Sequence, residues 1–283
     1  MNPKTPSYRA IKKVSGWLGF VDYEIFRTLN SNCISNEQAA LEIGVHHGKS
    51  ILAIAGFSGE AKIYVIDIFG DQEKNIDNSG SGDRDIFLKN MQKFGIDAER
   101  IVIDQRMSSE VGSQDVKDAV GLIRFFHIDG GHHSDAVTSD IKLACAVAAD
   151  ECVIAIDDMF RPEWPEVSSA AFGSTTLTDN DFVLFAIGFN KGYWCRKEHV
   201  EYNQKLLKEN NFLVANLHKI YTVEGRNILV FQRYPLPEWG IITVLLWYLE
   251  VYHPTVYRPA GMLYQRLRKT AKQLLRRGKI KKI

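Results

Sequence analysis

The chain has 283 residues, of which 45% are hydrophobic and 24% are charged. These proportions are ordinary for a soluble globular protein with one large domain or two small ones, long enough to bury a substantial core. No apolar run reaches the ~20 residues that a membrane-spanning helix needs, and residues 1–13 are too polar for a secretory signal peptide. The four cysteines show no C-x-x-C spacing, which is typical of reduced, mostly buried thiols in a cytoplasmic protein.

The net charge of +1 conceals an uneven distribution of charge along the chain. Residues 252–283 contain ten Lys or Arg and no acid, which leaves a net charge of −9 on the remainder. We expect residues 236–283 to form a helical, basic C-terminal extension. Its apolar segment 241–251 and its amphipathic segment 262–275 favour helices that pack on the body or on a partner copy in a homo-oligomer. The alternative is peripheral membrane contact through residues 241–283.

The N-terminal part of the chain has two segments. Residues 1–16 are predicted to form a polar arm. Residues 17–30 repeat apolar side chains at helical spacing, with Val21, Ile25 and Leu29 on one face, which favours a helix packed over a sheet. A lid over a cofactor is the alternative interpretation of this helix.

The stretch L-E-I-G-V-H-H-G-K-S-I at residues 41–51 is the main functional signal. An apolar run leads into it, a turn from Gly44 to Gly48 follows, and residues 51–55 have the composition of a helix start. Such a strand, turn and helix let the backbone approach a ligand closely and direct free helix N–H groups at it. Glu42 stands two positions before the first glycine, in the pattern E-x-G-x-x-x-G.

A second buried parallel strand is predicted at residues 62–68, where K-I-Y-V-I-D-I is almost continuously apolar. Its Asp67, 25 residues after Glu42, stands where nucleoside-binding proteins hold the ribose hydroxyls. A polar, glycine-rich loop follows at residues 70–85 and is long enough to be functional. The next predicted elements are a helix over 86–94, a strand over 101–103 and a helix over 116–122.

Two further predicted strands end in acidic residues. Residues 123–128 run into the motif D-G-G-H-H, which begins at Asp129, and residues 152–156 run into Asp157 and Asp158. Ligands bind at the carboxyl ends of strands in open α/β sheets. Because carboxylates gathered there repel one another unless a cation or a proton joins them, this pattern indicates a metal site.

The remaining elements change in periodicity. Ser134 is expected to cap a helix through residue 147, and residues 161–174 are predicted as loop and short helix with two prolines. We expect an antiparallel pair of strands on the edge of an otherwise parallel sheet. The predicted elements are a strand over 182–189, a turn over 190–192, a helix over 199–210 and a final strand over 228–231.

Two nucleotide-binding interpretations compete for the glycine turn. A dinucleotide dehydrogenase needs G-x-G-x-x-G after the first strand, whereas this chain has Gly44 and Gly48 with no glycine at position 46. Glu42 is the kind of acid that a cofactor with a charged amino-acid end would use. S-adenosylmethionine (SAM) carries an ammonium group that a carboxylate can bind, directly or through water.

The chain resembles the class I SAM-dependent methyltransferases, and within them the metal-dependent small-molecule O-methyltransferases of the macrocin and sugar-methyltransferase type. The resemblance rests on L-E-I-G-V-H-H-G-K-S, V-I-D-I, S-S-E-V at residues 108–111, H-I-D-G-G-H-H-S-D-A-V from His127, and I-D-D from Ile156. It covers residues 17–231 and implies a methyltransferase domain over 17–235. The implied fold class is α/β and Rossmann-like, with a seven-stranded, mostly parallel sheet whose last strand is antiparallel.

Matching positions imply the cofactor contacts of that family. Glu42 and the backbone from Gly44 to Gly48 would hold the methionine end of SAM, and Ser50 its carboxylate. Asp67 would hold the ribose, and Ser108 would lie near the adenine. The cofactor-binding residues implied by the resemblance are therefore Glu42, Gly44, Gly48, Ser50, Asp67 and Ser108.

Asp129, Asp157 and Asp158 match the family's divalent-metal ligands, and Mg²⁺ suits a site of oxygen ligands. Methyl transfer is an in-line displacement in which the acceptor hydroxyl loses its proton as it attacks. A metal on that oxygen would lower its pKa and orient its attack. We expect Asp129 to be both ligand and base, with His132 in support. A histidine that begins a helix and bonds the backbone is the alternative for His132.

The expected function is SAM-dependent, Mg²⁺-assisted O-methylation of a hydroxyl on a sugar, a glycoconjugate or another small molecule. Residues 70–85 and 161–181 are expected to build the acceptor pocket, where Trp164 or Phe172 would stack on a sugar. Two other classes stay open, an NAD-dependent oxidoreductase and a non-catalytic SAM-binding or nucleic-acid-binding module. No nucleic-acid partner is expected, because the basic tail has no aromatic residue after Tyr264.

Overall fold

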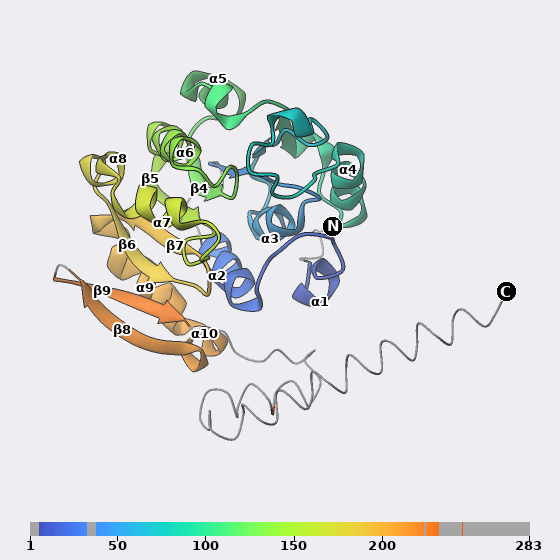
Figure 1. Ribbon diagram of the computed structural model, residues 1–283. Helices are drawn as coiled ribbons and strands as arrows, with labels where there is room; N and C mark the ends of the chain where they lie inside the picture. The colour runs from blue at the N-terminus through green and yellow to red at the C-terminus, as the bar shows by residue number, and fades with distance from the viewer. Residues whose placement is uncertain (1–5, 33–37, 224, 232–244, 246–283) are drawn as a thin grey trace, which may run out of the picture. The chain divides into compact units, whose positions relative to one another are not determined.

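A computed structural model of the protein describes residues 6–32, 38–223, 225–231 and Leu245 (Figure 1). By its contacts the chain divides into residues 1–233 and 234–283, and the fold and site belong to the first of these units. The helices predicted at 241–251 and 262–275 lie outside the described residues, apart from Leu245. No helix in the described part of the chain is long and apolar enough to cross a membrane.

The first unit is built on a nine-stranded sheet. The strands are β1 (Ala39–Ile43), β2 (Ile63–Ile66), β3 (Ile101–Asp104), β4 (Ile123–Ile128), β5 (Ala148–Ile156), β6 (Phe182–Ile187), β7 (Gly192–Arg196), β8 (Leu217–Val223) and β9 (Arg226–Phe231). Their order is β3-β2-β1-β4-β5-β7-β6-β9-β8, and β1 to β5 run parallel. The chain order reverses between β1 and β4, which is where ligands bind in open α/β sheets.

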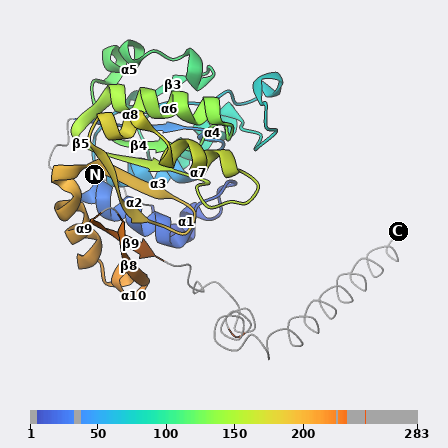
Figure 2. The same ribbon diagram turned by 60° about the vertical axis from the view of Figure 1, so that its left-hand side comes forward.

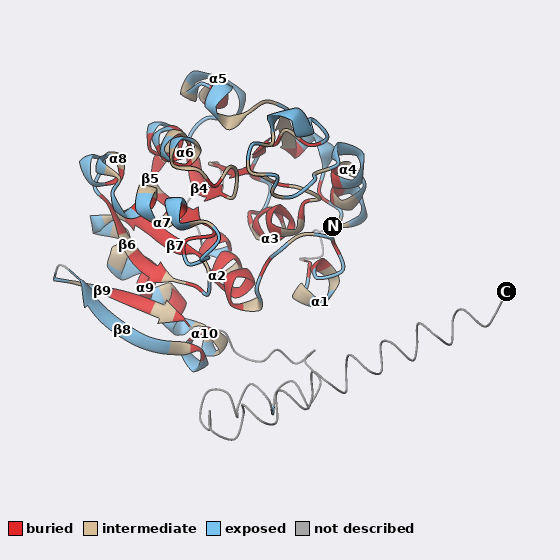
Figure 3. Ribbon diagram, viewed as in Figure 1, coloured by how far each residue is buried: buried red, intermediate tan, exposed pale blue. Residues whose placement is uncertain are grey.

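The mostly parallel, Rossmann-like class predicted from the sequence is confirmed, but the sheet has nine strands rather than seven. Strand β7 lies between β5 and β6 and runs antiparallel to both of them. The last strand in the chain, β9, runs parallel to β6 rather than antiparallel as predicted. β8 pairs antiparallel with β9 at the sheet edge and is exposed along most of its length (Figure 3). An exposed edge strand lacks the buried apolar run that marks a strand in the sequence, so β8 escapes prediction.

Helices cover both faces of the sheet (Figure 2). They are α1 (Tyr8–Ile11), α2 (Phe20–Ser31), α3 (Lys49–Phe57), α4 (Arg84–Lys93), α5 (Ser113–Val120), α6 (Ser134–Val147), α7 (Pro165–Phe172), α8 (Thr175–Asp179), α9 (Val200–Glu209) and α10 (Asn211–Ala215), with short 3-10 turns η1 (Gln72–Lys74), η2 (Ala98–Arg100), η3 (Ser108–Glu110) and η4 (Lys197–His199). One core joins one sheet face to α1 to α4, α9 and α10, and a second core joins the other face to α5 to α8. Successive strand residues feed the two cores alternately, as Ala40 and Leu41 do.

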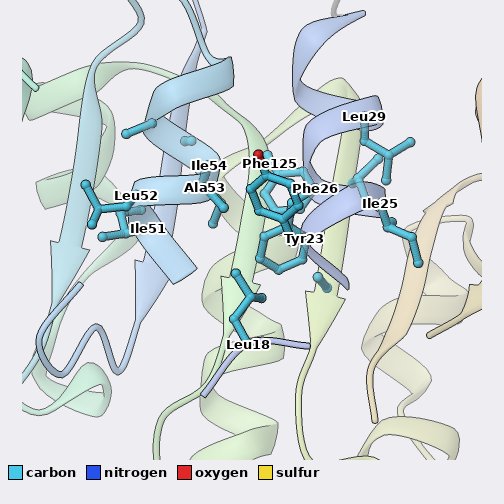
Figure 4. Close-up of a cluster of buried hydrophobic side chains, with 14 of the residues drawn as sticks. Leu18, Tyr23, Ile25, Phe26, Leu29, Ile51, Leu52, Ala53, Ile54 and Phe125 are labelled. Carbon is cyan, nitrogen blue, oxygen red and sulfur yellow. The ribbon is translucent and has the colours of Figure 1, made fainter. Parts of the chain in front are cut away.

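The helix predicted at residues 17–30 is α2, and it packs in the core rather than forming a lid. Figure 4 shows Phe26 of α2 against Phe125 of β4, with Ile54 of the neighbouring α3 close by. The two phenyl rings meet edge to face with centroids 5.1 Å apart, and Phe26 has no exposed surface. Burial of such an aromatic side chain stabilises the joint between α2 and the sheet.

Residues 6–16, within the predicted polar arm, belong to the folded body. Ile11 of α1 is fully buried. The hydroxyl of Tyr23 donates to the Pro6 carbonyl oxygen at 3.0 Å, and a Cβ on Gly56 would lie 2.4 Å from the Pro6 ring. These contacts tie the segment to α2 and α3, although its composition is polar overall.

The start of α6 differs in one detail from the prediction. Ser134 is the first helical residue, the N-cap position is His133, and neither side chain caps the helix. The carboxylate of Glu166 in α7 accepts the Ser134 N–H at 2.8 Å instead. A free helix N–H is therefore satisfied from a distant segment, which a local sequence pattern does not reveal.

Three of the four cysteines lie in the described residues, and they agree with the prediction of buried thiols. Cys145, Cys152 and Cys195 are free and buried. Burial raises the pKa of the Cys145 and Cys195 thiols to about 11 and about 12. Such thiols are protonated and unreactive at neutral pH.

Candidate active site

The turn between β1 and α3 depends on two glycines. Gly44 has a φ of +80°, and a Cβ there would lie 1.8 Å from the carbonyl oxygen of Asp129. Gly48 has a φ of +90°, and a Cβ there would lie 2.5 Å from the Met91 side chain of α4. Only glycine tolerates both the left-handed backbone and the lack of space. The turn thus lets the ends of β1 and β4 touch, which brings the carboxyls of Glu42 and Asp129 to one site.

Glu42 is fully buried in β1. Its Oε1 accepts a hydrogen bond from the hydroxyl of Ser50 and lies 2.8 Å from Nδ1 of His127, so Ser50 is directed at Glu42. Its Oε2 has no hydrogen-bond partner in the described part of the chain. Burial raises the pKa of Glu42 to about 8, against the effect of the Ser50 hydrogen bond. An arriving ammonium group would pair with this oxygen and favour the ionised carboxylate.

Asp67 follows β2, and backbone donors orient its carboxylate. The N–H of His46 donates to Oδ2 at 2.7 Å, and the N–H of Phe69 donates to Oδ1 at 2.5 Å. His46 has the left-handed φ of +50°, so the glycine turn itself delivers this N–H. A Cβ on Gly82 would come within 3.2 Å of Oδ1. The loop after β2 therefore lies directly over the predicted ribose site.

Ser108, the residue predicted near the adenine, begins η3, beside α6. It lies near Asp140, a fully buried carboxyl of α6 whose two oxygens have no hydrogen-bond partner in the described residues. Burial raises the pKa of Asp140 to about 7. A Cβ on Gly130 would come within 3.2 Å of Oδ2 of Asp140, so this carboxyl also supports the loop after β4. Asp140 escapes prediction because it lies inside a helix rather than at a strand end.

Asp129, Asp157 and Asp158 gather at the ends of β4 and β5. Burial, and then the negative charge of Asp157, raise the pKa of Asp129 well above its usual range. Asp158 has a left-handed φ of +56°, and its N–H donates to Oδ1 of Asp157 at 2.7 Å. Such a backbone costs roughly 1–3 kcal/mol and is concentrated at functional sites.

Lys191 supplies a buried positive charge to these carboxylates. It lies in the turn between β6 and β7, is 2% exposed, and its ammonium group pairs with Oδ2 of Asp157. The neighbouring Asn190 donates to Oδ1 of Asp158 at 2.6 Å and to Oδ1 of Asp157 at 3.2 Å. No local pattern distinguishes Asn190 and Lys191 from an ordinary turn, so the sequence gives no signal for them.

His132 connects the cluster to the loop after β2. Its Nε2 lies 2.8 Å from Oδ2 of Asp158, and its Nδ1 lies 2.8 Å from Oδ2 of Asp77. Oδ2 of Asp77 also accepts the His132 backbone N–H at 2.6 Å. Burial lowers the pKa of His132, but the hydrogen bonds to Asp158 and Asp77 outweigh it and raise the pKa to about 9. His132 is therefore a cation at neutral pH, and its ring stacks on Trp164 with centroids 4.5 Å apart.

The three aspartates predicted as metal ligands do not together offer free oxygen atoms to one metal ion. Asp129, His132 and Asp158 offer ligand atoms within 4.8 Å of one another, a group to which Asp157 does not belong. Both carboxylate oxygens of Asp157 are engaged, and both ring nitrogens of His132 face carboxylates. A divalent cation bound by three aspartates does not fit this arrangement, because the Lys191 ammonium group already lies beside Asp157.

Comparison with known proteins shows which domain the strands and their connecting loops resemble. Residues 41–159, from β1 to just beyond β5, match the family model of a methyltransferase domain. The O-methyltransferase NovP is similar in structure, with 14% identity and a TM-score of 0.52 over 63% of this chain and 80% of NovP. A protein from Corynebacterium glutamicum shows 10% identity and a TM-score of 0.50 over 68% of this chain and 92% of its own. No curated protein sequence matches the chain.

The fold is that of the class I methyltransferases, and residues 41–159 match the model of a methyltransferase domain. The matched residues contain the glycine turn, Asp67 and all three strand-end aspartates. Lys191 lies beyond the matched residues, on the hairpin that follows them.

Proposed function

We propose that the protein transfers the methyl group of SAM to a hydroxyl group of a small molecule, and that a sugar or a glycoconjugate is the acceptor class. The observation that carries the cofactor part is Glu42, whose buried Oε2 lacks a partner beside the glycine turn of a methyltransferase domain. Oxygen as the accepting atom is supported by NovP, which is an O-methyltransferase.

The site offers complementary groups for each end of SAM. The ammonium group of SAM pairs with the free oxygen of Glu42, and the nearby Asp129 adds a second negative charge. The ribose hydroxyls donate to Asp67, whose oxygens keep lone pairs beyond those used by the backbone. We expect the adenine to lie near Ser108, as the sequence predicts.

The chemistry requires one proton acceptor. The acceptor oxygen attacks the methyl carbon, the carbon–sulfur bond breaks, and S-adenosylhomocysteine leaves with the electron pair. Asp129 takes the hydroxyl proton in its ionised form, which the positive charge of Lys191 favours against burial and the charge of Asp157. His132 is protonated at neutral pH and therefore orients and balances the charges of Asp158 and Asp77 instead of accepting the proton.

The acceptor binds between the loop after β2 and the segment after β5. Phe160, two positions after Asp158, is 45% exposed, and Trp17 is 69% exposed with its ring centroid 5.8 Å from that of His46. Exposed aromatic faces suit the apolar face of a sugar ring. Trp164 stacks on His132, and Phe172 is 58% exposed with its ring centroid 6.5 Å from that of Trp194. Stacking of either ring on a sugar stays a prediction from the sequence.

The metal, the membrane contact and the homo-oligomer stay predictions from the sequence. No step of the proposed reaction uses Mg²⁺, since Asp157 is engaged by Lys191. Contact with a membrane surface or with a second copy concerns residues 241–283, which lie outside the described residues apart from Leu245.

Calorimetry with SAM tests the cofactor assignment. The wild type is expected to bind SAM, and Glu42→Gln is expected to bind it at least about tenfold more weakly, because the charged partner of the ammonium group is lost. Glu60→Gln, at an exposed position, is the matched control and should bind as the wild type does. Binding of NADH without SAM would contradict the proposal.

Transfer of labelled methyl from SAM to a panel of sugars tests the acceptor class. Methylation of sugars in preference to phenols and free amines is the expected result. Methylation of amines alone would contradict an oxygen acceptor, and methylation of phenols alone would contradict the sugar class while keeping O-methylation.

A further inference from the structure

The ammonium group of Lys191 stands among several buried carboxyls. It pairs with Asp157, and its positive charge also acts on the carboxyls of Asp22 and Asp129. Asp22 belongs to α2, is 3% exposed, and accepts the Tyr193 hydroxyl at 2.7 Å. The ammonium group further lies 6.0 Å from the centroid of the Phe26 ring. A cation thus sits where three separate elements direct acidic side chains.

The backbone around Lys191 holds this position. Gly192 pairs with Ile156, the residue immediately before Asp157, in the antiparallel ladder between β7 and β5. The N–H of Met159 donates to the Asn190 carbonyl oxygen at 3.0 Å, on the other side of the aspartates. The turn is therefore bonded to β5 and to the segment that follows it, which holds the backbone of Lys191 beside the aspartates.

A second cation beside Asp157 would meet strong repulsion. Like charges a few ångströms apart in a buried site repel far more strongly than in water. A hard divalent cation also needs free carboxylate oxygens, whereas those of Asp157 are taken by Lys191, Asn190 and the Asp158 N–H.

We propose that Lys191 supplies the positive charge that the sequence assigns to Mg²⁺, so that the native cluster of Asp129, Asp157 and Asp158 binds no divalent cation. Lys191 is then a positioning residue: it holds Asp157 in place and leaves the carboxyl of Asp129 free to act as the base. This role for Asp129 rests on the proposed function, whereas the competition between Lys191 and a metal does not.

The test compares Mn²⁺ binding by the wild type, Lys191→Met and Lys205→Met. Lys205 is an exposed lysine of α9 and serves as the matched control. Binding is followed by the loss of the free Mn²⁺ signal in electron paramagnetic resonance, without SAM. Lys191→Met is expected to bind Mn²⁺ at least about tenfold more tightly than the other two proteins. Equal affinity of the wild type and folded Lys191→Met overturns the proposal.

Lys191→Met leaves a buried carboxylate unpaired, so its folding is checked by circular dichroism. Lys191→Gln removes the charge and keeps a donor for Asp157, and the same gain in Mn²⁺ binding is expected. One outcome is independent of both variants: a Mn²⁺ site in the wild type that Asp157→Asn abolishes also overturns the proposal.

Titration of the wild type with SAM in the presence of EDTA separates the two proposals. Binding of SAM without metal supports the proposed function, and the Mn²⁺ comparison decides the role of Lys191. A wild type that binds SAM but also holds Mn²⁺ at Asp157 overturns the role of Lys191 and leaves the methyltransferase proposal intact. A wild type that binds no SAM overturns the proposed function, and the Mn²⁺ comparison remains decisive for Lys191.

Discussion

His132 makes the stability of the protein depend on pH in a predictable direction. Its pKa rises from 6.5 to about 9 in the folded protein, because the hydrogen bonds to Asp158 and Asp77 outweigh burial. The folded protein therefore binds this proton more tightly than the unfolded chain does, which corresponds to roughly 3 kcal/mol of stability. That contribution is fully present below pH ~6.5 and is lost as the pH rises through about 9.

Urea unfolding of the wild type and His132→Gln at pH about 6 and about 10 measures this effect. Glutamine retains hydrogen-bonding groups but cannot carry the charge, so the wild type should be more stable by roughly 3 kcal/mol at the lower pH. The difference should fall close to zero at the higher pH. His218→Gln, at an exposed position, controls for a general effect of losing a histidine. An equal difference between the wild type and His132→Gln at both pH values would refute the reasoning.

Three further predictions follow from single residues. Gly44→Ala should lower the free energy of unfolding by at least about 2 kcal/mol and abolish SAM binding, because its Cβ would overlap the Asp129 carbonyl oxygen; unfolding and calorimetry that match the wild type would contradict this. Asp129→Asn should lower kcat by roughly 10²–10⁴-fold with the fold retained, and an unchanged kcat would exclude Asp129 as the base. Asp140→Asn should be more stable than the wild type at pH about 8, and this gain should exceed the gain at pH about 4 by on the order of 2 kcal/mol or more. The reason is that burial penalises the charged carboxyl, which the wild type must carry at the higher pH. Urea unfolding at the two pH values measures the last effect, and a stability gain that does not depend on pH would contradict it.

The residues that are readable in the sequence act through short-range structure. The glycine turn, the apolar strands and the acids at their ends each occupy a few consecutive positions, so periodicity and spacing are sufficient to place them. In a parallel sheet the carboxyl ends of the strands share one edge. That rule alone brings Asp129 near Asp157 and Asp158, which the structure bears out.

The partners of those acids come from far along the chain. Asp77 reaches His132 across 55 positions, and Lys191 reaches Asp157 across 34 positions. Neither residue stands in a recognisable motif, because a loop aspartate and a turn lysine are ordinary at the surface. Their burial arises only when the loop after β2 closes over the site and β7 inserts beside β5.

Tertiary packing therefore decides which positive charge neutralises these aspartates. As a linear pattern, three strand-end aspartates need a cation, and Mg²⁺ is the usual one. In the folded protein the charge is provided by the ammonium group of Lys191 and by protonated His132. Local order along the chain settles which groups lie at the edge of the sheet. Long-range packing settles which charges face them, because electrostatic partners are chosen by distance in space and not by distance in sequence.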